Sequence, residues 1–286
     1  MHNNLDETEY NETGIKVLMY QRIVDNESLR RVHWSYVSAG QLRKHLELLN
    51  KWGFTPITFV DYQRSLSGEF CLPKRPVILT FENGYRAARR LVFPLMREYG
   101  MNAVIFALGD RSMETDQWDR QMGLREEQLA SDEELIEMHE AGFEVGSHSL
   151  SHMDLTRLTD QEAATEITGS KEALESVIRD KVLSFSYPYG AVDGRIREMV
   201  MNAGYSFGCG IDTGSPHFGA DPLNIRRITI TSSTGTLSFG LKLLTRDEKS
   251  EWIGAGPYQT FRNFYSDDPL AIRNAMNKEG QVRSAS

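Results

Sequence analysis

Short apolar runs alternate with amphipathic stretches along most of the chain. The runs are typical of buried strands, and the stretches between them space apolar residues as in helices with one buried face. Strands that alternate with helices at this interval indicate a parallel sheet, closed or nearly closed into a barrel. The pattern predicts strands near residues 15–20, 57–59, 77–81, 103–107, 143–147, 182–185, 205–209 and 225–230, and helices near 38–53, 85–99, 131–142, 159–179, 193–203 and 235–244.

The pattern also divides the chain. We expect residues 1–14 to be a flexible N-terminal arm, residues 15–244 a single α/β domain, and residues 245–286 a polar C-terminal tail. A length of 286 residues is ordinary for a one-domain α/β barrel. Within the domain, residues 109–130 are polar and irregular, and we expect them to form an excursion over the rim of a pocket.

Composition and charge narrow the class of protein. A hydrophobic fraction of 40% and a charged fraction of 25% are those of a globular protein with a large core. A net charge of −8, with no long basic run, argues against nucleic acid or an anionic membrane as the main partner. The two cysteines predict no disulfide framework. The sequence has no signal peptide pattern and no apolar run long enough to span a bilayer, so we expect a cytoplasmic protein with no membrane insertion.

The first stretch with candidate chemistry lies at the end of the apolar run 77–81. Glu82 and Asn83 follow that run directly, and the C-terminal end of a strand is where α/β proteins bind ligands. The two side chains are therefore expected at the mouth of a pocket. The alternative is a simple turn, because Asn before Gly84 tolerates a left-handed conformation.

The second stretch carries two histidines, His148 and His152, just after the predicted strand 143–147. Imidazoles four positions apart lie on one face of a helical turn and can bind one cation together. Two neutral imidazoles leave a divalent cation short of charge, so a carboxylate is expected nearby, and Glu82 and Asn83 are the obvious suppliers. The alternative is two unrelated surface histidines.

The third stretch, Tyr187 to Gly190, follows the predicted strand 182–185. Pro188 fixes the backbone locally and can aim the amide of Tyr189 into the pocket as a donor to an oxyanion. A purely structural turn is an equally good interpretation of this stretch alone.

Together the three stretches resemble the motifs of the polysaccharide deacetylase (NodB-homology) family, the family-4 carbohydrate esterases. The resemblance runs from about residue 16 to residue 230. Thr-Phe-Glu-Asn-Gly-Tyr at 80–85 stands where the family has Thr-Phe-Asp-Asp-Gly-Tyr. His-Ser-Leu-Ser-His at 148–152 matches the second motif without change, and Pro-Tyr-Gly at 188–190 matches a variant third motif that lacks the usual Arg.

The resemblance implies a distorted (β/α)7-type barrel, a divalent metal that is commonly zinc, and hydrolysis of N-acetyl groups on an N-acetylated sugar polymer or oligomer. It implies that Glu82 is the general base and that His148, His152 and Asn83 are the metal ligands. It also implies that the amide at Tyr189 steadies the oxyanion. We expect three further residues to contact the substrate in the same pocket: Gln21, Pro188 and Trp118. The ring of Trp118 is available to stack on a sugar.

The chain departs from the family at several of these positions. Glu82 moves its carboxylate by one methylene, and Asn83 offers an amide oxygen without formal charge, so we expect lower affinity for zinc. Glu82 can alternatively turn to the metal, which leaves no obvious base. Gln21 stands where many relatives carry His. The late Leu-x-His motif that supplies the general acid has no match; Arg226 and Arg227 lie in that region, and His217 is a weak substitute.

Three functions remain open from the sequence. The first is a metal-dependent carbohydrate de-N-acetylase. The second is a deacetylase-like protein that has lost catalysis and binds saccharide or has a regulatory role. The third is a hydrolase of a small amide or an acylated lipid.

Overall fold

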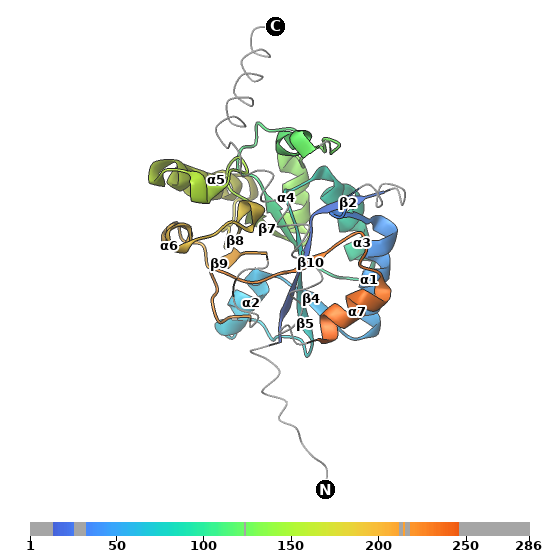
Figure 1. Cartoon of the computed structure of the whole chain (residues 1–286). Coiled ribbons are helices and arrows are strands. Elements are labelled where there is room, and N and C mark those ends of the chain that lie inside the picture. Colours follow the sequence, from blue (N-terminus) through green and yellow to red (C-terminus); the bar gives the residue numbers. More distant parts are fainter. Residues whose placement is uncertain (1–13, 26–32, 123, 212–213, 215–217, 246–286) are drawn as a thin grey trace.

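The computed structural model describes residues 14–25, 33–122, 124–211, 214 and 218–245. The expected N-terminal arm, apart from residue 14, and the expected polar tail, apart from residue 245, lie outside these residues. The protein is built around a curled parallel sheet ringed by helices, as the alternating pattern predicts (Figure 1). The strands of this sheet are β1 (Lys16–Tyr20), β4 (Thr55–Ile57), β5 (Pro76–Phe81), β6 (Val104–Ala107), β7 (Glu144–Ser147), β8 (Ser184–Ser186), β9 (Phe207–Cys209) and β10 (Ile228–Ile230).

The strand order is β10-β1-β5-β6-β7-β8-β9, with β4 paired to β5, and every pairing is parallel. The two ends of this order meet through the segment before β10. Gly210 N donates to Ile225 O (2.9 Å) and Arg227 N donates to Ile211 O (3.0 Å). The seam between the first and the last strands is therefore bridged, and the distorted barrel expected from the sequence is confirmed.

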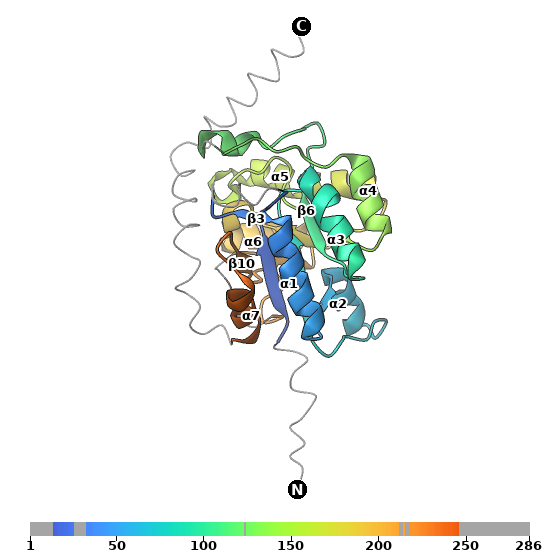
Figure 2. The ribbon, with the colours of Figure 1, turned by 90° about the vertical axis from the view of Figure 1, so that its right-hand side faces the viewer.

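The helices form a layer around the sheet. Figure 2 shows α1, α3 and α4 along one side, and α5 and α6 continue the ring. The helices are α1 (Ala39–Lys51), α2 (Phe59–Leu66), α3 (Phe93–Glu98), α4 (Asp132–Glu140), α5 (Asp160–Ile178), α6 (Gly194–Asn202) and α7 (Thr236–Leu244), with a π-helical turn at Ala88–Val92 and 3-10 turns at Gln117–Met122, Leu155–Arg157 and Pro188–Gly190. None of the helices in the described part of the chain combines the length and the apolar character that crossing a bilayer requires.

Most predicted elements are present, and their ends follow local signals. Ser38 caps α1, and Ser131 forms a capping box with Glu134 at the start of α4. The expected strand at 57–59 is wrong, because β4 ends at Ile57 and Thr58 forms a capping box with Asp61 that starts α2. A small parallel sheet of β2 (Arg22–Val24) and β3 (Tyr36–Ser38) was not predicted from the sequence.

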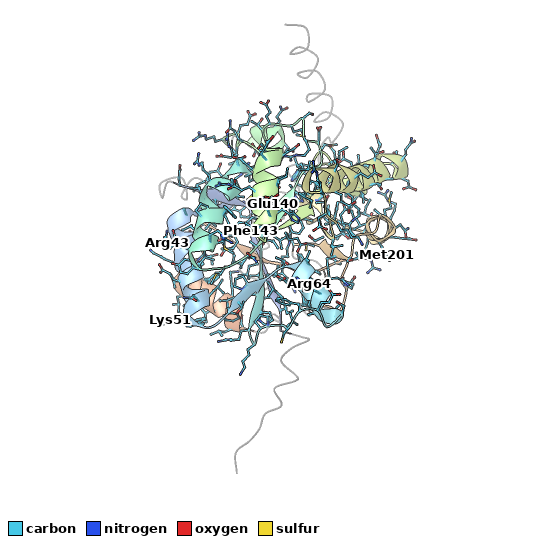
Figure 3. All side chains as sticks on the ribbon, turned by 180° about the vertical axis from the view of Figure 1, so that it is seen from behind. Arg43, Lys51, Arg64, Glu140, Phe143 and Met201 are labelled. Atoms are coloured by element: carbon cyan, nitrogen blue, oxygen red, sulfur yellow. The ribbon has the colours of Figure 1, made fainter. Side chains whose placement is uncertain are left out.

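Side-chain alternation along the strands separates two apolar layers. One face of the strands, with Leu18 and Leu79, packs against helical residues such as Leu42. The other face, with Ile78 and Phe106, fills the inside of the curled sheet. In Figure 3 the charged side chains of helices, such as those of Arg43 and Glu140, lie on the outside. The inner face is the one that carries polar residues at the C-terminal ends of the strands, where the candidate site lies.

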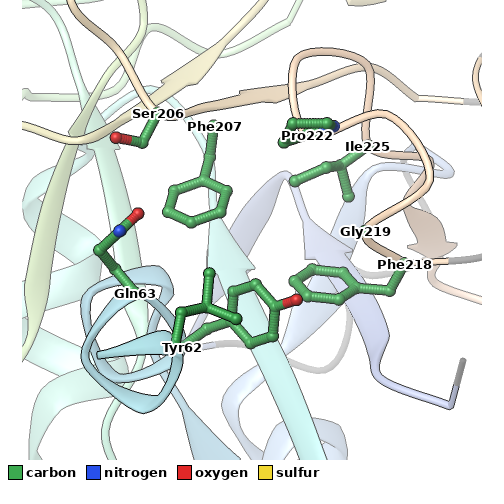
Figure 4. Close-up of a pocket in the computed structure, with 9 residues that line it drawn as sticks. Tyr62, Gln63, Ser206, Phe207, Phe218, Gly219, Pro222 and Ile225 are labelled. Carbon is green, nitrogen blue, oxygen red and sulfur yellow. The ribbon is translucent and has the colours of Figure 1, made fainter. Parts of the chain in front are cut away.

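The lower end of the barrel, at the N-terminal ends of the strands, is plugged by α2. Val60 N at the start of α2 donates to Glu144 Oε2 (3.1 Å), and Ser184 Oγ donates to Glu144 Oε1 (2.5 Å). An apolar pocket of about 230 Å³ lies beside this plug, with the rings of Tyr62, Phe207 and Phe218 around it (Figure 4). This pocket is at the end of the barrel opposite to the residues that the sequence analysis singled out.

Candidate active site

Glu82 stands at the inner face of the barrel just beyond β5. Tyr20 pairs with Phe81 in the parallel register, and Glu82 N donates to Tyr20 O (3.0 Å), so Glu82 follows the strand before the chain turns. The residues after it, Asn83 (φ 68°) and Gly84 (φ 64°), are both left-handed. A Cβ on Gly84 would lie 3.0 Å from Ala107, so both the turn and the close packing favour glycine. The turn interpretation and the site interpretation of Glu-Asn-Gly are therefore compatible.

The carboxylate of Glu82 is fully engaged. Arg227 Nη1 donates to Oε1 (2.6 Å) and Nη2 to Oε2 (3.2 Å), while Ser186 Oγ donates to Oε2 (2.8 Å). Burial by itself would raise the pKa of Glu82, but the Arg227 guanidinium, together with His148 and Ser186, holds that pKa below its ordinary value. Glu82 is thus an ionised carboxylate inside the protein, and its partners leave it little freedom to turn toward a metal.

Arg227 is the functional residue whose role the sequence analysis missed. It comes from the seam before β10, is 1% exposed, and also donates from Nε to Gly210 O (2.8 Å). Its guanidinium lies 5.5 Å from the centre of the Phe106 ring. A buried carboxylate needs a buried cation as a partner. The expected position of Glu82 at a strand end therefore indicated that a basic residue should lie near the end of another strand. The pair Arg226–Arg227 was the available signal.

His148 follows β7 and faces Glu82. Its Nε2 lies 3.8 Å from Glu82 Oε2, and its Nδ1 donates to Ser186 O (2.8 Å). Because a carbonyl oxygen can only accept, the Nδ1 carries the proton and the Nε2 lone pair is available. Burial lowers the pKa of His148, although Glu82 opposes the shift. His148 is therefore a neutral imidazole with a free donor atom on the side of the carboxylate.

His152 lies beside His148, with ring centres 4.8 Å apart. The expected helical turn is wrong: Ser149 and His152 both have φ of 63°, and the backbone between them is an irregular loop. Glu166 of α5 fastens this loop by accepting hydrogen bonds from Ser151 N (2.8 Å) and Ser151 Oγ. Burial and the neighbouring His148 hold the pKa of His152 well below its ordinary value.

Two aromatic residues enclose His152. The Trp118 ring stacks on it at 4.4 Å and 12°, and the Tyr189 hydroxyl lies 3.0 Å from its Nδ1. Trp118 is 2% exposed and its indole covers His152, and the expected stacking of this ring on a sugar stays a prediction. The excursion at 109–130 thus lies over the candidate site, as expected, and contributes a cover to it.

Tyr189 and Pro188 form a tight turn after β8. Pro188 begins the 3-10 turn, Tyr189 has φ of 58°, and Gly190 N donates to Tyr187 O (2.9 Å). The turn brings the Tyr189 side chain to His152. The expected role of the Tyr189 amide as an oxyanion donor stays a prediction.

Asn83 and Gln21 each bury an unused amide oxygen. Asn83 is 1% exposed, its Nδ2 donates to the Tyr85 hydroxyl (2.7 Å), and its Oδ1 has no hydrogen-bond partner within the described residues. Gln21 directly follows β1, the strand that pairs with β5, and its Oε1 is likewise without a partner among the described residues. Such orphaned acceptors are costly unless a donor or a cation satisfies them.

The donor set can be tested against a divalent metal. The described His, Cys, Asp and Glu side chains nowhere form a group of three that could hold a metal ion. Two imidazoles and the orphaned Asn83 Oδ1 supply three neutral donors, which fit a divalent cation in number and type but add no charge. His217, the expected substitute for the general acid, lies outside the described residues. Cys71 is exposed, Cys209 is buried, and both are free thiols.

Several known proteins are similar to this chain in sequence. Residues 70–208 match the family model for polysaccharide deacetylase. YxkH of Bacillus subtilis, described as a polysaccharide deacetylase, is 23% identical over 226 residues, which are 79% of this chain and 75% of YxkH. The peptidoglycan-N-acetylmuramic acid deacetylase PdaC of the same organism is 29% identical over 130 residues, which are 45% of this chain but only 24% of PdaC.

Solved structures show the same fold. The Streptococcus pyogenes deacetylase PplD superposes with a TM-score of 0.69 at 18% identity, over 82% of this chain and 100% of that chain. A polysaccharide deacetylase from Bacillus cereus superposes with a TM-score of 0.65 at 23% identity, over 81% and 69%. The motifs, the barrel and these matches agree, and the chain is similar to polysaccharide deacetylases in sequence over residues 70–208 and in fold over most of its length.

Proposed function

We propose that this chain hydrolyses N-acetyl groups of a carbohydrate polymer or oligomer, with Glu82 as the general base. The observation that carries the proposal is the buried Glu82 carboxylate, held by Arg227 and 3.8 Å from His148 Nε2. A base that is already ionised and fixed in place can accept a proton from water without reorganising. The ion pair with Arg227 also makes Glu82 a weaker base, so we expect slow turnover.

His148, His152 and Asn83 would hold the divalent cation, for which zinc is the first candidate. Imidazole nitrogens suit zinc, and the proton on His148 Nδ1 leaves Nε2 free to bind it. The cation, when bound, lowers the pKa of water and polarises the acetyl carbonyl. Because none of the three ligands is charged, we expect weaker binding than a site with a carboxylate ligand would give.

The remaining roles follow from position. The amide of Tyr189, in the turn fixed by Pro188, is the proposed donor to the oxyanion, and Gln21 and Pro188 are proposed substrate contacts. Relatives whose names state a substrate act on N-acetylated polymers, namely peptidoglycan, chitin and poly-β-1,6-N-acetyl-D-glucosamine. An N-acetylated sugar polymer or oligomer is therefore the substrate class to test first.

The test measures acetate release from N-acetylglucosamine oligomers by the metal-free protein with added zinc or cobalt. We expect slow release that depends on the metal, loss of activity in His148→Ala and Glu82→Gln, and a metal-dependent rise in the unfolding midpoint that His148→Ala abolishes. Absence of both acetate and bound metal would refute the proposal. A parallel panel of small N-acetyl amides and acylated lipids separates the polymer from the smaller substrates.

Two observations favour the second candidate, a catalytically silent protein that binds saccharide. Trp118 covers His152, and Asn83 brings no charge to the site, so both access and metal affinity are reduced. Saccharide binding without acetate release would support this candidate. This candidate would also be supported if the double variant Glu82→Asp, Asn83→Asp gained a deacetylase activity that the natural chain lacks.

A further inference from the structure

Asn83 belongs to a buried chain of hydrogen bonds that reaches across the top of the barrel. Asn83 Nδ2 donates to the Tyr85 hydroxyl (2.7 Å), and that hydroxyl donates to Asp116 Oδ2 (3.0 Å). Asp116 also accepts from Glu127 N (2.6 Å) and is paired with Arg22, which is bound to Asp119 as well. Asp116 is not exposed at all, and Tyr85 is 4% exposed. The chain therefore joins the candidate site to the excursion at 109–130.

The direction of this chain is fixed by chemistry. A phenol has one proton to donate, an amide nitrogen can only donate, and an ionised carboxylate can only accept. The proton of Tyr85 must therefore point to Asp116, and its oxygen must receive the N–H of Asn83. This arrangement determines which way the Asn83 amide faces, because its nitrogen is bound to Tyr85 and its oxygen is left without a partner.

An aspartate at position 83 would not fit this chain. Its oxygen would meet the Tyr85 oxygen where the amide nitrogen now donates, and the single phenol proton would have to serve two buried carboxylates. One of them would then lie buried next to an acceptor without a proton between them, which is costly. The same position accepts a carboxylate only if Asp116 becomes a donor.

We propose that Tyr85 and Asp116 are positioning residues for Asn83, and that they make an amide, and not a carboxylate, the compatible residue at this position. The hydrogen-bond chain fixes the orientation of the amide, and it polarises the amide toward a more negative oxygen because the chain ends in a carboxylate. This inference rests on the proposed function. The hydrogen-bond chain explains how a metal site can keep a neutral third ligand, because the negative charge that a carboxylate ligand would carry lies two hydrogen bonds away, on Asp116.

The test is a double-mutant cycle of Asn83→Asp and Asp116→Asn, measured as the urea unfolding midpoint of the metal-free proteins. We expect each single variant to lower the midpoint and the double variant to lose less than the sum of the two single losses. In the double variant the new amide at position 116 would donate to the Tyr85 hydroxyl, and that hydroxyl would donate to the new carboxylate at position 83. Arg22 Nη2 binds the same Asp116 oxygen as the Tyr85 hydroxyl, so this contact is lost in both variants that carry Asp116→Asn, and its loss cancels in the cycle; Arg22 retains Asp119 in every variant. If the loss of midpoint in the double variant equals the sum of the two single losses, the proposal is overturned, because residues 83 and 116 would then not interact through Tyr85.

Cobalt titration of the same proteins supplies the second readout. We expect Asn83→Asp alone to bind cobalt no more tightly than the natural chain, and the double variant to bind it more tightly. Tyr85→Phe should weaken binding about tenfold or more, as loss of a residue that supports a metal ligand generally does. Tighter cobalt binding by the single Asn83→Asp variant, with an unchanged midpoint, would overturn the proposal.

Tyr36→Phe is the matched control for Tyr85→Phe. Tyr36 also packs against the Arg22 guanidinium, 5.6 Å from the ring centre, but its buried hydroxyl has no hydrogen-bond partner among the residues that the structure describes. Its removal should leave cobalt affinity unchanged; an equal loss in both Phe variants would overturn the proposal. A further outcome separates the two proposals. If the unfolding midpoint of the double variant is rescued but none of the proteins binds cobalt, the hydrogen-bond chain is supported and the proposed metal-dependent function is not.

Discussion

At the scale of single residues, the site depends on one ion pair inside the barrel. Glu82 and Arg227 are separated by 145 positions in sequence, and both are nearly inaccessible to solvent. Neither charge is tolerable in the interior without the other, because water cannot solvate either of them there. The pair therefore controls both the protonation state of the proposed base and the stability of the fold.

Replacing Arg227 tests this dependence. We expect Arg227→Met to lower the free energy of unfolding by about 3–5 kcal/mol, as breaking a buried ion pair does, and to abolish acetate release because Glu82 becomes protonated. Urea unfolding and the acetate assay measure the two effects. Adding Glu82→Gln should return part of the stability but no activity.

The neighbouring Arg226 provides the control. It is only partly buried, so Arg226→Met should change the free energy of unfolding by no more than about 0.5 kcal/mol. Equal stability of Arg227→Met and Arg226→Met would contradict the role given to the ion pair.

At the scale of elements, the excursion at 109–130 covers part of the candidate site. Its backbone is tied to the barrel by Arg86 N, which donates to Gln128 O (2.8 Å), and by Ala130 N, which donates to Gly84 O (2.8 Å). Trp118 then places its ring over His152. The indole therefore covers this face of the His152 ring, and we expect it to limit access to His152.

Removing the indole should expose His152. We expect Trp118→Ala to increase the rate at which diethyl pyrocarbonate modifies His152, measured by mass spectrometry relative to His139 in the same sample. His139 lies on α4 with its side chain 25% exposed, so it serves as an internal reference. An unchanged ratio of the two rates would show that Trp118 does not control access.

The sequence predicted the elements better than the contacts between them. Periodicity and capping signals located most strands and helices, since these signals are local. The helix α2 was missed because its first residues are β-branched or aromatic, although Thr58 and Asp61 have the spacing of a capping box. The meeting of the two histidines was predicted, but through a helical turn, whereas left-handed residues in a loop achieve it.

The pairing of Arg22 with Asp116 and Asp119 had no local signal. These residues lie more than ninety positions apart in sequence and belong to no periodic pattern, so only the fold identifies them as partners. The same holds for Glu82 and Arg227.

At the scale of the whole molecule, the barrel has a titratable carboxyl at its plugged end. Glu144 is 5% exposed, and burial raises its pKa to about 7, although Ser184 and the amides at the start of α2 oppose the shift. Its ordinary pKa is about 4.5. Between these two values the folded protein holds a proton that the unfolded chain has released, so stability must fall as the pH rises.

We expect the natural chain to lose up to about 2.4 kcal/mol of stability from this group between pH 5 and pH 7.5, measured by urea unfolding at each pH. Glu144→Gln keeps the size of the side chain and cannot ionise, so its stability should change less over the same interval. Parallel pH curves for the two proteins would contradict the assignment to Glu144.

The seam of the barrel has a consequence for synthesis on the ribosome. Glu82, His148 and Tyr189 have all left the exit tunnel well before Arg227, which is presented by the segment just ahead of β10. A nascent chain that has emerged only as far as β9 would have to bury the Glu82 carboxyl without its guanidinium, which either costs free energy or protonates the group. We therefore expect the upper end of the barrel to close, with Glu82 ionised, only after translation has passed the segment that carries Arg227.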